Sequence, residues 1–398
     1  MRILVAHNHY IVPGGEDVAA AMEVELLRRE GHEVLYFEMT NKDFESLSPF
    51  AKVRHLLSWD WSRTVHDRFR KELQAFRPDV AHFHNTFFMM TPSVYDACQA
   101  EGVPVVQSLH NFRLLCANAL FFRDGTPCEE CTAHGLRQGI RYGCYHHSRL
   151  LTWAVVRMLE KHWQRGTWTR KIDAFVVMSD FVRSRYVSNG LPSEKVFVKP
   201  NFLEPDPGVR THDAGYVLFG GRLSEEKGVR TLIQAWQKLK NVPLVMAGTG
   251  PLAAELKQAA SQQGLEGIFF AGFLGREAYF QQLRGARCLV VPSEWYENMP
   301  VTIVEAFACG IPVIASRIGS LDGIVKDGHN GLLFVPGDAA GLADCVRRLA
   351  EDKDLAVRLG AGARRSFEAL YTARKNYDRL MDVYRHAQAA FVDIREVS

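Results

Sequence analysis

Residues 216–236, YVLFGGRLSEEKGVRTLIQAW, decide the fold class. They begin with a short apolar run, cross a turn that holds three glycines, and continue with Val229, Leu232 and Trp236 on one face of a helical pattern. A nearly continuous apolar run is typical of a strand buried on both faces, and a strand followed in this way by a helix builds a parallel sheet. The stretch therefore predicts an α/β protein.

The same pattern recurs along the chain in two series of six strands. The first series covers 2–6, 33–37, 79–84, 104–108, 174–178 and 196–198, and the second covers 216–219, 243–247, 268–271, 288–291, 312–315 and 332–335. Two series favour two doubly wound, Rossmann-like parallel-sheet domains, with a linker at 201–213 that contains Pro and Gly. Ligands of such domains bind at the carboxyl ends of the strands, so we expect the site in the cleft between the domains.

We accordingly divide the chain into three parts. Residues 1–203 form the first predicted domain, which carries a Cys-containing insertion at 112–147, and residues 204–372 form the second. Residues 373–398 are a long helical pattern with no strand after it. We expect a helix there that can cross back to the first domain.

The composition excludes several classes of protein. The chain has 398 residues, 47% of them hydrophobic and 23% charged, which is ordinary for a folded protein. Its net charge is 48 − 45 = +3, so it lacks the basic field of a nucleic-acid-binding protein. The first apolar run is too short for a signal peptide, and no run of about 18 apolar residues predicts a transmembrane helix. We therefore expect a cytoplasmic protein with reduced cysteines.

Gly14 and Gly15 follow the first predicted strand and precede a helical pattern. Glycines let backbone N–H groups come close to an anion, and a helix start adds partial positive charge, so this turn suits a phosphate group. A plain glycine turn explains the pair equally well. The turn is not the G-x-G-x-x-G motif of dinucleotide-binding dehydrogenases.

Arg222 and Lys227 lie five residues apart on the turn inside 216–236. The fork of an arginine and the point charge of a lysine can together neutralise one diphosphate. The alternative is a pair of solvated cations beside Ser224, with Ser224 as a helix cap.

Two glutamates follow the predicted strand 288–291. Glu297 lies in a loop, and Glu305 lies on a predicted helix that is otherwise apolar. A carboxylate among apolar side chains needs a partner, and sugar hydroxyls are suitable partners. The backbone amides of Asn298 and Met299, at the predicted helix start, could donate to a hexosyl group or a phosphate there. The alternative is a helix-capping Glu297 and a salt-bridged Glu305.

In combination these features resemble the retaining family-4 glycosyltransferases of the GT-B fold. The resemblance rests on Glu297-x7-Glu305, on the segment GGRLSEEKG at 220–228, on the Pro-Gly-Gly loop at 13–15 and on the run FVPGD at 334–338. It covers most of the chain. It implies a first domain that binds the acceptor and a second domain that binds a nucleotide diphosphate sugar of the UDP or GDP type.

The resemblance also implies roles for individual residues. The implied catalytic residues are His110, Glu297, Arg222 and Lys227. The implied donor-binding residues are Gly14, Gly15, Arg222, Lys227, Gly272, Phe273, Leu274, Glu297, Asn298, Met299, Pro300 and Glu305. Glu297 would hold the donor sugar, Glu305 the ribose and the two cations the diphosphate, while the 272–274 turn would contact the base and His110 would lie near the transferred sugar. The chain departs from the commoner Glu-Gly-aromatic-Gly/Pro form of the motif at Asn298 and Met299.

We expect catalysis without a cofactor. Cleavage at the anomeric carbon produces an oxocarbenium-like sugar and a more negative leaving group, which fixed cations and helix dipoles stabilise. The one Asp-x-Asp sequence, at 352–354, lies at the predicted start of a late surface helix. The family resemblance implies that the anomeric configuration is retained. Because no motif positions a carboxylate nucleophile, we favour attack on the same face, with the leaving phosphate accepting the proton of the acceptor.

Four cysteines of the insertion 112–147 follow the pattern C-x11-C-x2-C-x12-C. They are Cys116, Cys128, Cys131 and Cys144. Four thiolates suit a tetrahedral zinc ion, although only one pair has the usual ligand spacing. Unliganded thiols and disulfides are the alternatives, and a zinc ion here would be structural.

Two stretches are locally basic. Residues 52–77 carry 7 − 3 = +4 charges, and residues 147–171 carry 6 − 1 = +5 together with Trp153, Trp163 and Trp168. Cations and aromatic side chains of this kind suit peripheral contact with an anionic membrane surface. A solvated helix face with buried tryptophans explains them equally well.

The sequence therefore predicts a glycosyltransferase that transfers a hexose to a saccharide or lipid-linked acceptor. Bacterial surface polysaccharide synthesis at the inner face of the cell membrane is the favoured setting. A nucleotide-sugar epimerase of the same fold is one alternative. A zinc-stabilised binding protein without catalysis is the other, and the presence of both glutamates and both cations argues against it.

Overall fold

The computed structural model describes residues 1–11 and 14–397 of the chain. Contacts divide the chain into two compact units. The first unit consists of Met1–Ala119, Glu129–Lys199 and the residues from Asn376 on, and the second consists of Leu120–Cys128 and Pro200–Lys375. Pro13, in the expected Pro-Gly-Gly loop, lies outside the described residues.

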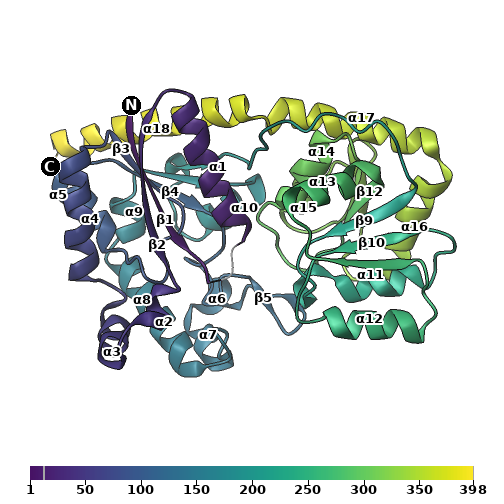
Figure 1. Cartoon of the computed structure of the whole chain (residues 1–398). Helices are drawn as coiled ribbons and strands as arrows, with labels where there is room; N and C mark the ends of the chain where they lie inside the picture. Colours follow the sequence, from purple (N-terminus) through teal and green to yellow (C-terminus); the bar gives the residue numbers. More distant parts are fainter. Residues whose placement is uncertain (12–13, 398) are drawn as a thin grey trace. The chain divides into compact units, whose positions relative to one another are not determined.

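The first unit is built around a six-stranded parallel sheet with helices on both of its faces (Figure 1). The strand order is β2-β1-β3-β4-β7-β8. The strands are β1 (Arg2–His9), β2 (Glu33–Thr40), β3 (Val80–Phe83), β4 (Val105–Leu109), β7 (Ala174–Val177) and β8 (Val196–Val198). The helices are α1 (Gly15–Arg29), α2 (Asp43–Ser46), α3 (Pro49–Ser58), α4 (Arg63–Phe76), α5 (Ser93–Glu101), α6 (Glu130–His134), α7 (Arg137–Tyr142), α8 (Arg149–Gln164), α9 (Thr167–Arg170), α10 (Asp180–Ser188), the 3-10 turn η1 (Ser193–Lys195) and most of α18 (Ala373–Val397).

The second unit has a six-stranded parallel sheet of its own, in the order β11-β10-β9-β12-β13-β14. Its strands are β9 (Tyr216–Gly220), β10 (Leu244–Ala247), β11 (Ile268–Gly272), β12 (Ala286–Val291), β13 (Val313–Ser316) and β14 (Gly331–Phe334), and a hairpin of β5 (Phe122–Arg123) and β6 (Thr126–Pro127) belongs to the same unit. Its helices are the 3-10 turn η2 (Glu225–Lys227), α11 (Val229–Trp236), α12 (Ala253–Gln262), α13 (Arg276–Gly285), α14 (Val301–Ala308), α15 (Ser320–Ile324), α16 (Ala339–Glu351) and α17 (Lys353–Leu370).

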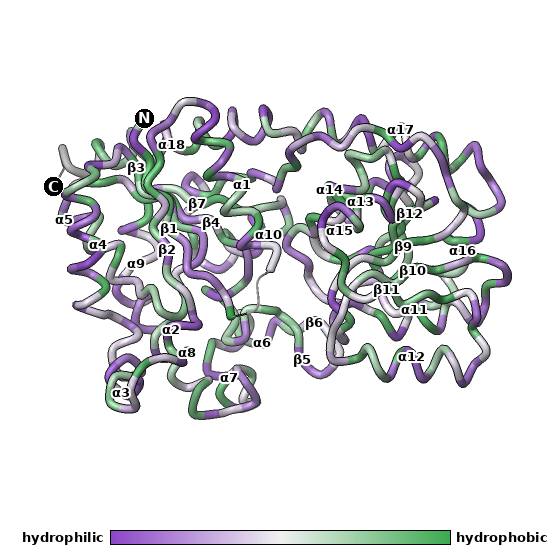
Figure 2. The backbone as a smooth tube through the Cα atoms, in the orientation of Figure 1, coloured by the Kyte–Doolittle hydropathy of each residue, from purple (hydrophilic) through white to green (hydrophobic). Residues whose placement is uncertain are grey.

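The expected doubly wound α/β architecture is confirmed, and each of the twelve predicted strands is present. The strands β3, β4 and β7 are buried along their whole length, and Figure 2 shows the sheet strands as predominantly hydrophobic segments. In the second unit, Val229, Leu232 and Trp236 of α11 are buried in the core, on the one apolar face that the sequence pattern predicts.

Strand β1 runs to His9, three residues beyond its predicted end at Ala6. The extra residues are polar but largely buried, because other elements supply partners for them. The Asn8 backbone N–H donates to the Asn85 carbonyl at 2.9 Å, and His7 Nε2 lies 2.9 Å from an Asp17 carboxylate oxygen. Such partners cannot be seen in a local sequence pattern.

The division into units differs from the expected one at three places. The whole insertion 112–147 was assigned to the first domain, but its hairpin segment Leu120–Cys128 groups with the second unit. The boundary near the linker lies at Lys199/Pro200, so that residues 201–203 belong to the second unit. The boundary near the start of α18 lies at Lys375/Asn376, so that residues 373–375 also belong to the second unit. From Asn376 on, α18 packs with the first unit, where His386 makes an edge contact with Phe197 of β8.

Candidate active site

Four loops of the second unit leave its sheet at the same edge. They follow β11, β10, β9 and β12, which are consecutive neighbours in a parallel sheet, so all four start at carboxyl ends of strands. Open parallel sheets bind ligands at this edge. The predicted donor-binding residues of the second unit lie on three of these loops or just beyond them, on α14.

The loop after β9 carries Arg222 and Lys227. Lys227 lies in η2 and not in the following helix, because Gly228 interrupts the helix with a left-handed backbone (φ 64°). A Cβ atom on Gly228 would lie 1.8 Å from the Pro292 carbonyl oxygen, so only glycine fits. Ser224 caps no helix; its hydroxyl donates to Glu226 instead. One part of the alternative for this turn is thereby removed.

The loop after β10 was not singled out from the sequence, although it has a visible Gly-x-Gly signal at 248–250. The Leu223 N–H donates to the Thr249 carbonyl at 2.9 Å, which ties this loop to the cation-bearing loop. A Cβ atom on Gly248 would lie 1.8 Å from the Gly221 carbonyl oxygen. The two glycines therefore allow the close backbone approach that holds Arg222 and Lys227 in place.

The structure joins Lys227 to Glu297. Lys227 Nζ donates to Glu297 Oε1 at 2.6 Å, and the Ser293 hydroxyl donates to the same oxygen at 2.7 Å. Glu297 is only 5% exposed, and the Lys227 ammonium also lies over the Trp295 ring at 5.2 Å. Glu297 is not a helix cap, because the residue before α14 is Pro300 and α14 has no side-chain cap. The predicted cation and the predicted sugar-binding acid thus form one partly buried ion pair.

Arg222 is exposed, and within the described residues its guanidinium forms no salt bridge. It is therefore a cation that has not been neutralised by the protein, as a diphosphate site requires. The structure does not join it to Lys227 or to either glutamate.

Glu305 lies on α14, where it is surrounded mainly by buried apolar residues. Burial raises the pKa of its carboxyl to about 7, against a smaller opposing effect of Arg276. Among the described residues it has neither a salt bridge nor a side-chain hydrogen bond, so the salt-bridged alternative is not realised. The Tyr279 hydroxyl is also buried, and among the described residues it has no hydrogen-bond partner. Burial, together with the nearby charge of Glu305, raises the pKa of this hydroxyl. A pair of ligand hydroxyls would satisfy such groups.

The turn after β11 exposes an aromatic ring. Phe273 is 80% exposed, between Gly272 and the half-buried Leu274. The Gly248 N–H donates to the Gly272 carbonyl at 2.7 Å, so the turn is held against the loop after β10. An exposed ring of this kind can stack on a nucleotide base.

Asn298, Met299 and Pro300 lead into α14, which begins at Val301. Asn201 fixes this approach, since its backbone N–H donates to the Met299 sulfur and its side-chain amide donates to the Met299 carbonyl, both at 3.2 Å. Met299 is buried. The departure from the commoner motif thus places a packed side chain at this point of the loop.

In the first unit, Gly14 and Gly15 lie at the start of α1, as predicted. The Gly14 N–H already donates to Asp17 Oδ2 at 2.7 Å, within a capping box. The Asp17 carboxylate therefore occupies the position in which a phosphate was expected beside Gly14. Burial opposes ionisation of Asp17, but the hydrogen bonds from His7 and Gly14 lower its pKa.

His110 follows β4, and His84 follows β3. His84 Nδ1 lies 3.0 Å from His110 Nε2, and the two rings are nearly parallel, with an interplanar angle of 17°. Burial and the neighbouring His84 hold the pKa of His110 well below its usual range, so its imidazole is neutral at pH 7. His84 had not been singled out from the sequence.

Glu16, next to the glycines, also has an unusual environment. Its carboxylate accepts a hydrogen bond from the Tyr10 hydroxyl at 3.0 Å, and burial raises the pKa of Glu16 to about 8. No sequence pattern points to this environment, because Glu16 stands at the polar start of an ordinary amphipathic helix.

Two groups in the described residues bring three metal-ligand-type atoms within 4.8 Å of one another: His7, His9 and Asp17, and Glu23, His82 and His84. In the second group the Lys199 ammonium lies 2.5 Å from Glu23, and a cation already in this position disfavours a metal ion.

The structure brings only two of the four predicted zinc ligands together. Cys116 and Cys131 are hydrogen-bonded to each other, and this bond, together with burial, raises the pKa of the Cys131 thiol. Cys128 belongs to the segment that groups with the second unit, and Cys144 follows α7 in the first. The zinc site stays a prediction.

The basic stretches differ in their exposure. Trp168 is buried and the Trp163 indole donates to the Leu114 carbonyl, whereas Trp153 of α8 is 48% exposed. Lys161 and Lys171 are engaged in ion pairs with Asp60 and Asp96. Among the described residues, none of the helices combines the length and the hydropathy that a transmembrane span requires.

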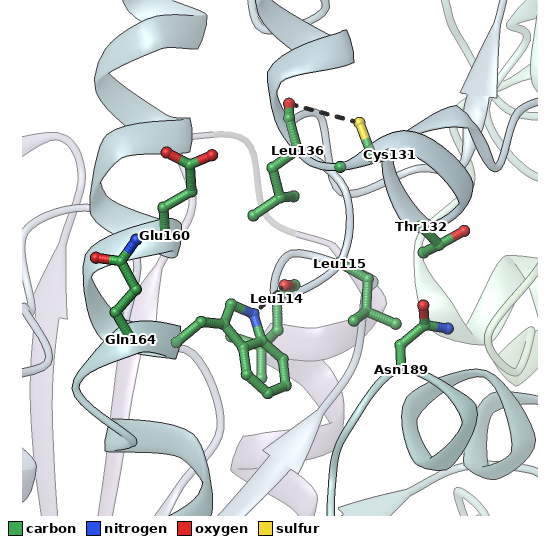
Figure 3. A pocket seen from close by; sticks show the side chains of 10 residues that line it. Leu114, Leu115, Cys131, Thr132, Leu136, Glu160, Gln164 and Asn189 are labelled. Atoms are coloured by element: carbon green, nitrogen blue, oxygen red, sulfur yellow. Dashed lines mark hydrogen bonds between the residues drawn. The ribbon is translucent and has the colours of Figure 1, made fainter.

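A cavity of about 320 Å³ lies beside the cysteine-containing insertion (Figure 3). Its apolar lining includes Leu114, Leu115 and Trp163. Polar side chains such as Gln164 and Asn189 stand around it (Figure 3). Its lining contains Cys131 but none of the predicted donor-binding residues. This cavity is therefore separate from the predicted donor-binding site.

Comparison with known protein families assigns one family to each half of the chain. Residues 13–207 match the family described as Glycosyltransferase Family 4, and residues 204–366 match Glycosyl transferases group 1. The two matches together cover most of the chain.

Individual relatives are more distant. The chain is 26% identical over 266 residues to an alpha-D-kanosaminyltransferase of Streptomyces kanamyceticus, which covers 60% of this chain and 69% of that protein. It is 29% identical over 171 residues to the O-antigen chain mannosyltransferase C of Escherichia coli, which covers 42% of this chain and 46% of that protein.

The fold matches that of a solved structure. The Anabaena protein Alr3699/HepE, crystallised in complex with UDP-glucose, superposes with a TM-score of 0.66 at 17% identity, over 96% of this chain and 99% of that one. This likeness confirms the expected GT-B architecture.

Proposed function

Because the chain belongs to the family-4 glycosyltransferases of the GT-B fold, we propose that it transfers a hexose from a nucleotide diphosphate sugar, of the UDP or GDP type, to a saccharide acceptor. One observation carries this proposal. The carboxyl edge of the second sheet holds an unneutralised Arg222, the Lys227–Glu297 pair and the partnerless Glu305 on neighbouring loops and on α14.

In this proposal Arg222 and Lys227 bind the diphosphate, and their charges stabilise the departing nucleotide. Glu297 accepts hydrogen bonds from hydroxyls of the donor sugar, and Glu305 accepts them from the ribose. Phe273 stacks on the base. The Gly14–Gly15 turn and His110 contribute from the first unit, as the family resemblance implies.

The anomeric configuration is retained in the proposed reaction. The acceptor hydroxyl attacks on the face from which the nucleotide leaves, and the leaving phosphate accepts its proton. The glycosidic bond to phosphate breaks as the new bond to the acceptor oxygen forms, and no metal or cofactor takes part. The fixed charge of Arg222 supports this step, because it requires no ion from solution.

The proposed acceptor is a lipid-linked saccharide of bacterial surface polysaccharide synthesis, met at the inner face of the membrane. This choice is supported by the Escherichia coli relative, which is named as an O-antigen chain mannosyltransferase. So does the start of α8, where Leu150 is 73% exposed beside Trp153 and Arg157. Apolar and cationic side chains together favour an anionic lipid surface.

A panel of nucleotide sugars tests the proposal, with the shift of the melting temperature as the first measurement. A ligand present at about 100 times its Kd adds roughly 2.7 kcal/mol of stability. Lys227→Ala and Glu305→Ala should each lose most of the shift that the best donor gives. The exposed Lys238 and Glu351 supply matched controls, and Lys238→Ala and Glu351→Ala should respond as the parent does.

Product analysis with the best donor then separates the alternatives. A glycosyltransferase releases the nucleotide and forms a product only with an acceptor, whereas an epimerase returns a changed nucleotide sugar. A binding protein gives the shift without turnover. If Lys227→Ala and Glu305→Ala both keep the full shift, the assigned pocket is wrong.

A further inference from the structure

A chain of buried polar side chains in the first unit ends on His110. We propose that Glu23 and His84 are positioning residues, which hold His110 as the neutral tautomer protonated at Nε2 and leave Nδ1 as the hydrogen-bond acceptor that meets the ligand. The part of this inference that concerns the ligand rests on the proposed function of His110. The part that concerns the tautomer rests on the distances, the burial and the charges of Glu23, His84 and His110.

The first link joins the two imidazoles. His84 Nδ1 and His110 Nε2 are 3.0 Å apart, a hydrogen-bond distance. A hydrogen bond between two neutral imidazoles needs one N–H and one lone pair, so the protonation of one ring fixes that of the other. Burial lowers the pKa of His84 to about 4, and that of His110 lies well below its usual range, so both rings are neutral at pH 7.

The second link decides which ring donates. His84 Nε2 lies 3.2 Å from Glu23 Oε1, at ion-pair distance rather than in an aligned hydrogen bond. A lone pair at Nε2 would face the negative carboxylate, whereas an N–H there is attracted to it. His84 is therefore protonated at Nε2, its Nδ1 carries the lone pair, and His110 Nε2 must donate.

The charge on Glu23 is itself fixed. Burial alone would favour the neutral acid, but Lys199 Nζ lies 2.5 Å from Glu23 Oε2 and His82 Nδ1 lies 3.0 Å from Oε1. These neighbours hold the pKa of Glu23 well below its usual range. An ionised carboxylate in a nearly water-free site therefore directs the tautomer of His84.

Helix α18 completes the cluster. The Tyr384 hydroxyl lies 2.8 Å from His82 Nδ1, and Asn376 Oδ1 accepts a hydrogen bond from Lys199 at 3.3 Å. His82 Nε2 in turn contacts the Ser108 hydroxyl at 2.9 Å. The end of the chain thus buries the groups that set the charge of Glu23, more than 250 residues from His110 in sequence order.

The tautomer of His110 decides whether its other ring nitrogen, Nδ1, accepts or donates a hydrogen bond. Among the described residues, His110 Nδ1 has no hydrogen-bond partner. With the proton at Nε2, Nδ1 accepts a hydrogen bond from a sugar hydroxyl; with the proton at Nδ1, the ring would donate one instead. The network therefore sets the direction of the hydrogen bond that His110 can make to the transferred sugar.

The test is a measurement of the His110 tautomer by 15N NMR of the full chain labelled at histidine, without any donor. The His110 signals are assigned by their loss in His110→Asn. We expect shifts of an Nε2-protonated ring in the parent. Glu23→Gln keeps the shape but removes the charge, and His84→Leu removes the acceptor, so both should move the His110 shifts toward the other tautomer.

Two further variants make the result decisive. In His84→Asn the amide oxygen takes the place of Nδ1 as acceptor, so the parent tautomer should return. Glu25→Gln, at an exposed position of α1, should change nothing. Because Glu23→Gln can destabilise the fold, the comparison of His84→Leu with His84→Asn stands without it. Unchanged His110 shifts in His84→Leu would overturn the inference.

Transfer kinetics test the remaining step. With the best donor, His84→Leu should lower kcat by about 10- to 100-fold, with little change in the donor KM, and His84→Asn should restore most of it. If the tautomer responds as expected but no donor is turned over, the proposed function fails and the positioning network stands. If turnover is present but the tautomer does not respond, the network fails alone.

Discussion

Lys227 Nζ lies 2.6 Å from Glu297 Oε1, so the cation assigned to the diphosphate and the acid assigned to the sugar are partners of each other. The two residues are 70 positions apart and come together because β9 and β12 are neighbours in the sheet. Each therefore holds the other in a fixed place. A donor would bind to an ion pair that is already formed. Less conformational entropy is then lost on binding, because these two side chains are ordered beforehand.

The first prediction concerns the stability of this pair. Lys227→Ala leaves the buried Glu297 with the Ser293 hydroxyl as its remaining partner, so it should lower the free energy of unfolding by about 2 kcal/mol. Adding Glu297→Gln in the same chain should restore most of that loss, because no buried charge remains. Urea denaturation measures both. Donor binding should stay lost in the double variant, and a double variant as unstable as Lys227→Ala would show that the pair is not coupled.

The second prediction follows from the raised pKa of Glu305. An acid with a pKa of about 7 in the folded protein and 4.5 in the unfolded chain binds more protons when folded, so stability falls as the pH rises through this window. Glu305→Gln removes the effect. It should be about 3 kcal/mol more stable than the parent above pH 7 and equally stable near pH 4. Denaturation curves at several pH values check this, and a constant difference would contradict it.

The third prediction concerns the effect of Glu305 ionisation on donor binding. Ribose hydroxyls donate to the ionised form of Glu305, so donor affinity in the parent should rise with pH up to about pH 7 and then level off. Isothermal titration with the best nucleotide sugar measures the affinity. Glu305→Gln should bind more weakly and without this dependence. A slope that persists in Glu305→Gln must come from another group.

The fourth prediction concerns the backbone at Gly228. An alanine there meets the Pro292 carbonyl and a left-handed backbone, which by itself costs roughly 1–2 kcal/mol. The loop must shift to relieve the contact, and Lys227 shifts with it. Gly228→Ala should therefore weaken donor binding more than stability alone explains. Gly323→Ala, at a helical glycine with open space around its Cβ position, is the matched control and should bind normally.

The strands were predictable because burial on both faces leaves a local trace, a continuous apolar run. The partners of polar residues leave no such trace. Glu305 stood out as an acid on an apolar helix, but the pairing of Lys227 with Glu297 depends on strand order, which periodicity does not contain. His84 and Glu23 were missed for the same reason. Their partners are His110 after β4, Lys199 after β8 and His82 on β3, which are distant in the sequence.

The fifth prediction tests the membrane-facing part of the proposal. Trp153 and Leu150 stand exposed on α8, and the Arg157 guanidinium lies 5.6 Å from the centre of the Trp153 ring. An aromatic ring with a cation beside it inserts at the headgroup level of an anionic bilayer, where both parts are solvated well.

Co-sedimentation with phosphatidylglycerol vesicles measures this binding. Trp153→Ala and Leu150→Ser should each reduce it several-fold, and added salt should reduce it in the parent. Val357→Ser, at an equally exposed apolar position on α17 of the second unit, should have no effect. Equal binding by the parent and Trp153→Ala would remove α8 from the docking surface and leave the transfer reaction itself untouched, because none of the residues that hold the donor lies on this helix.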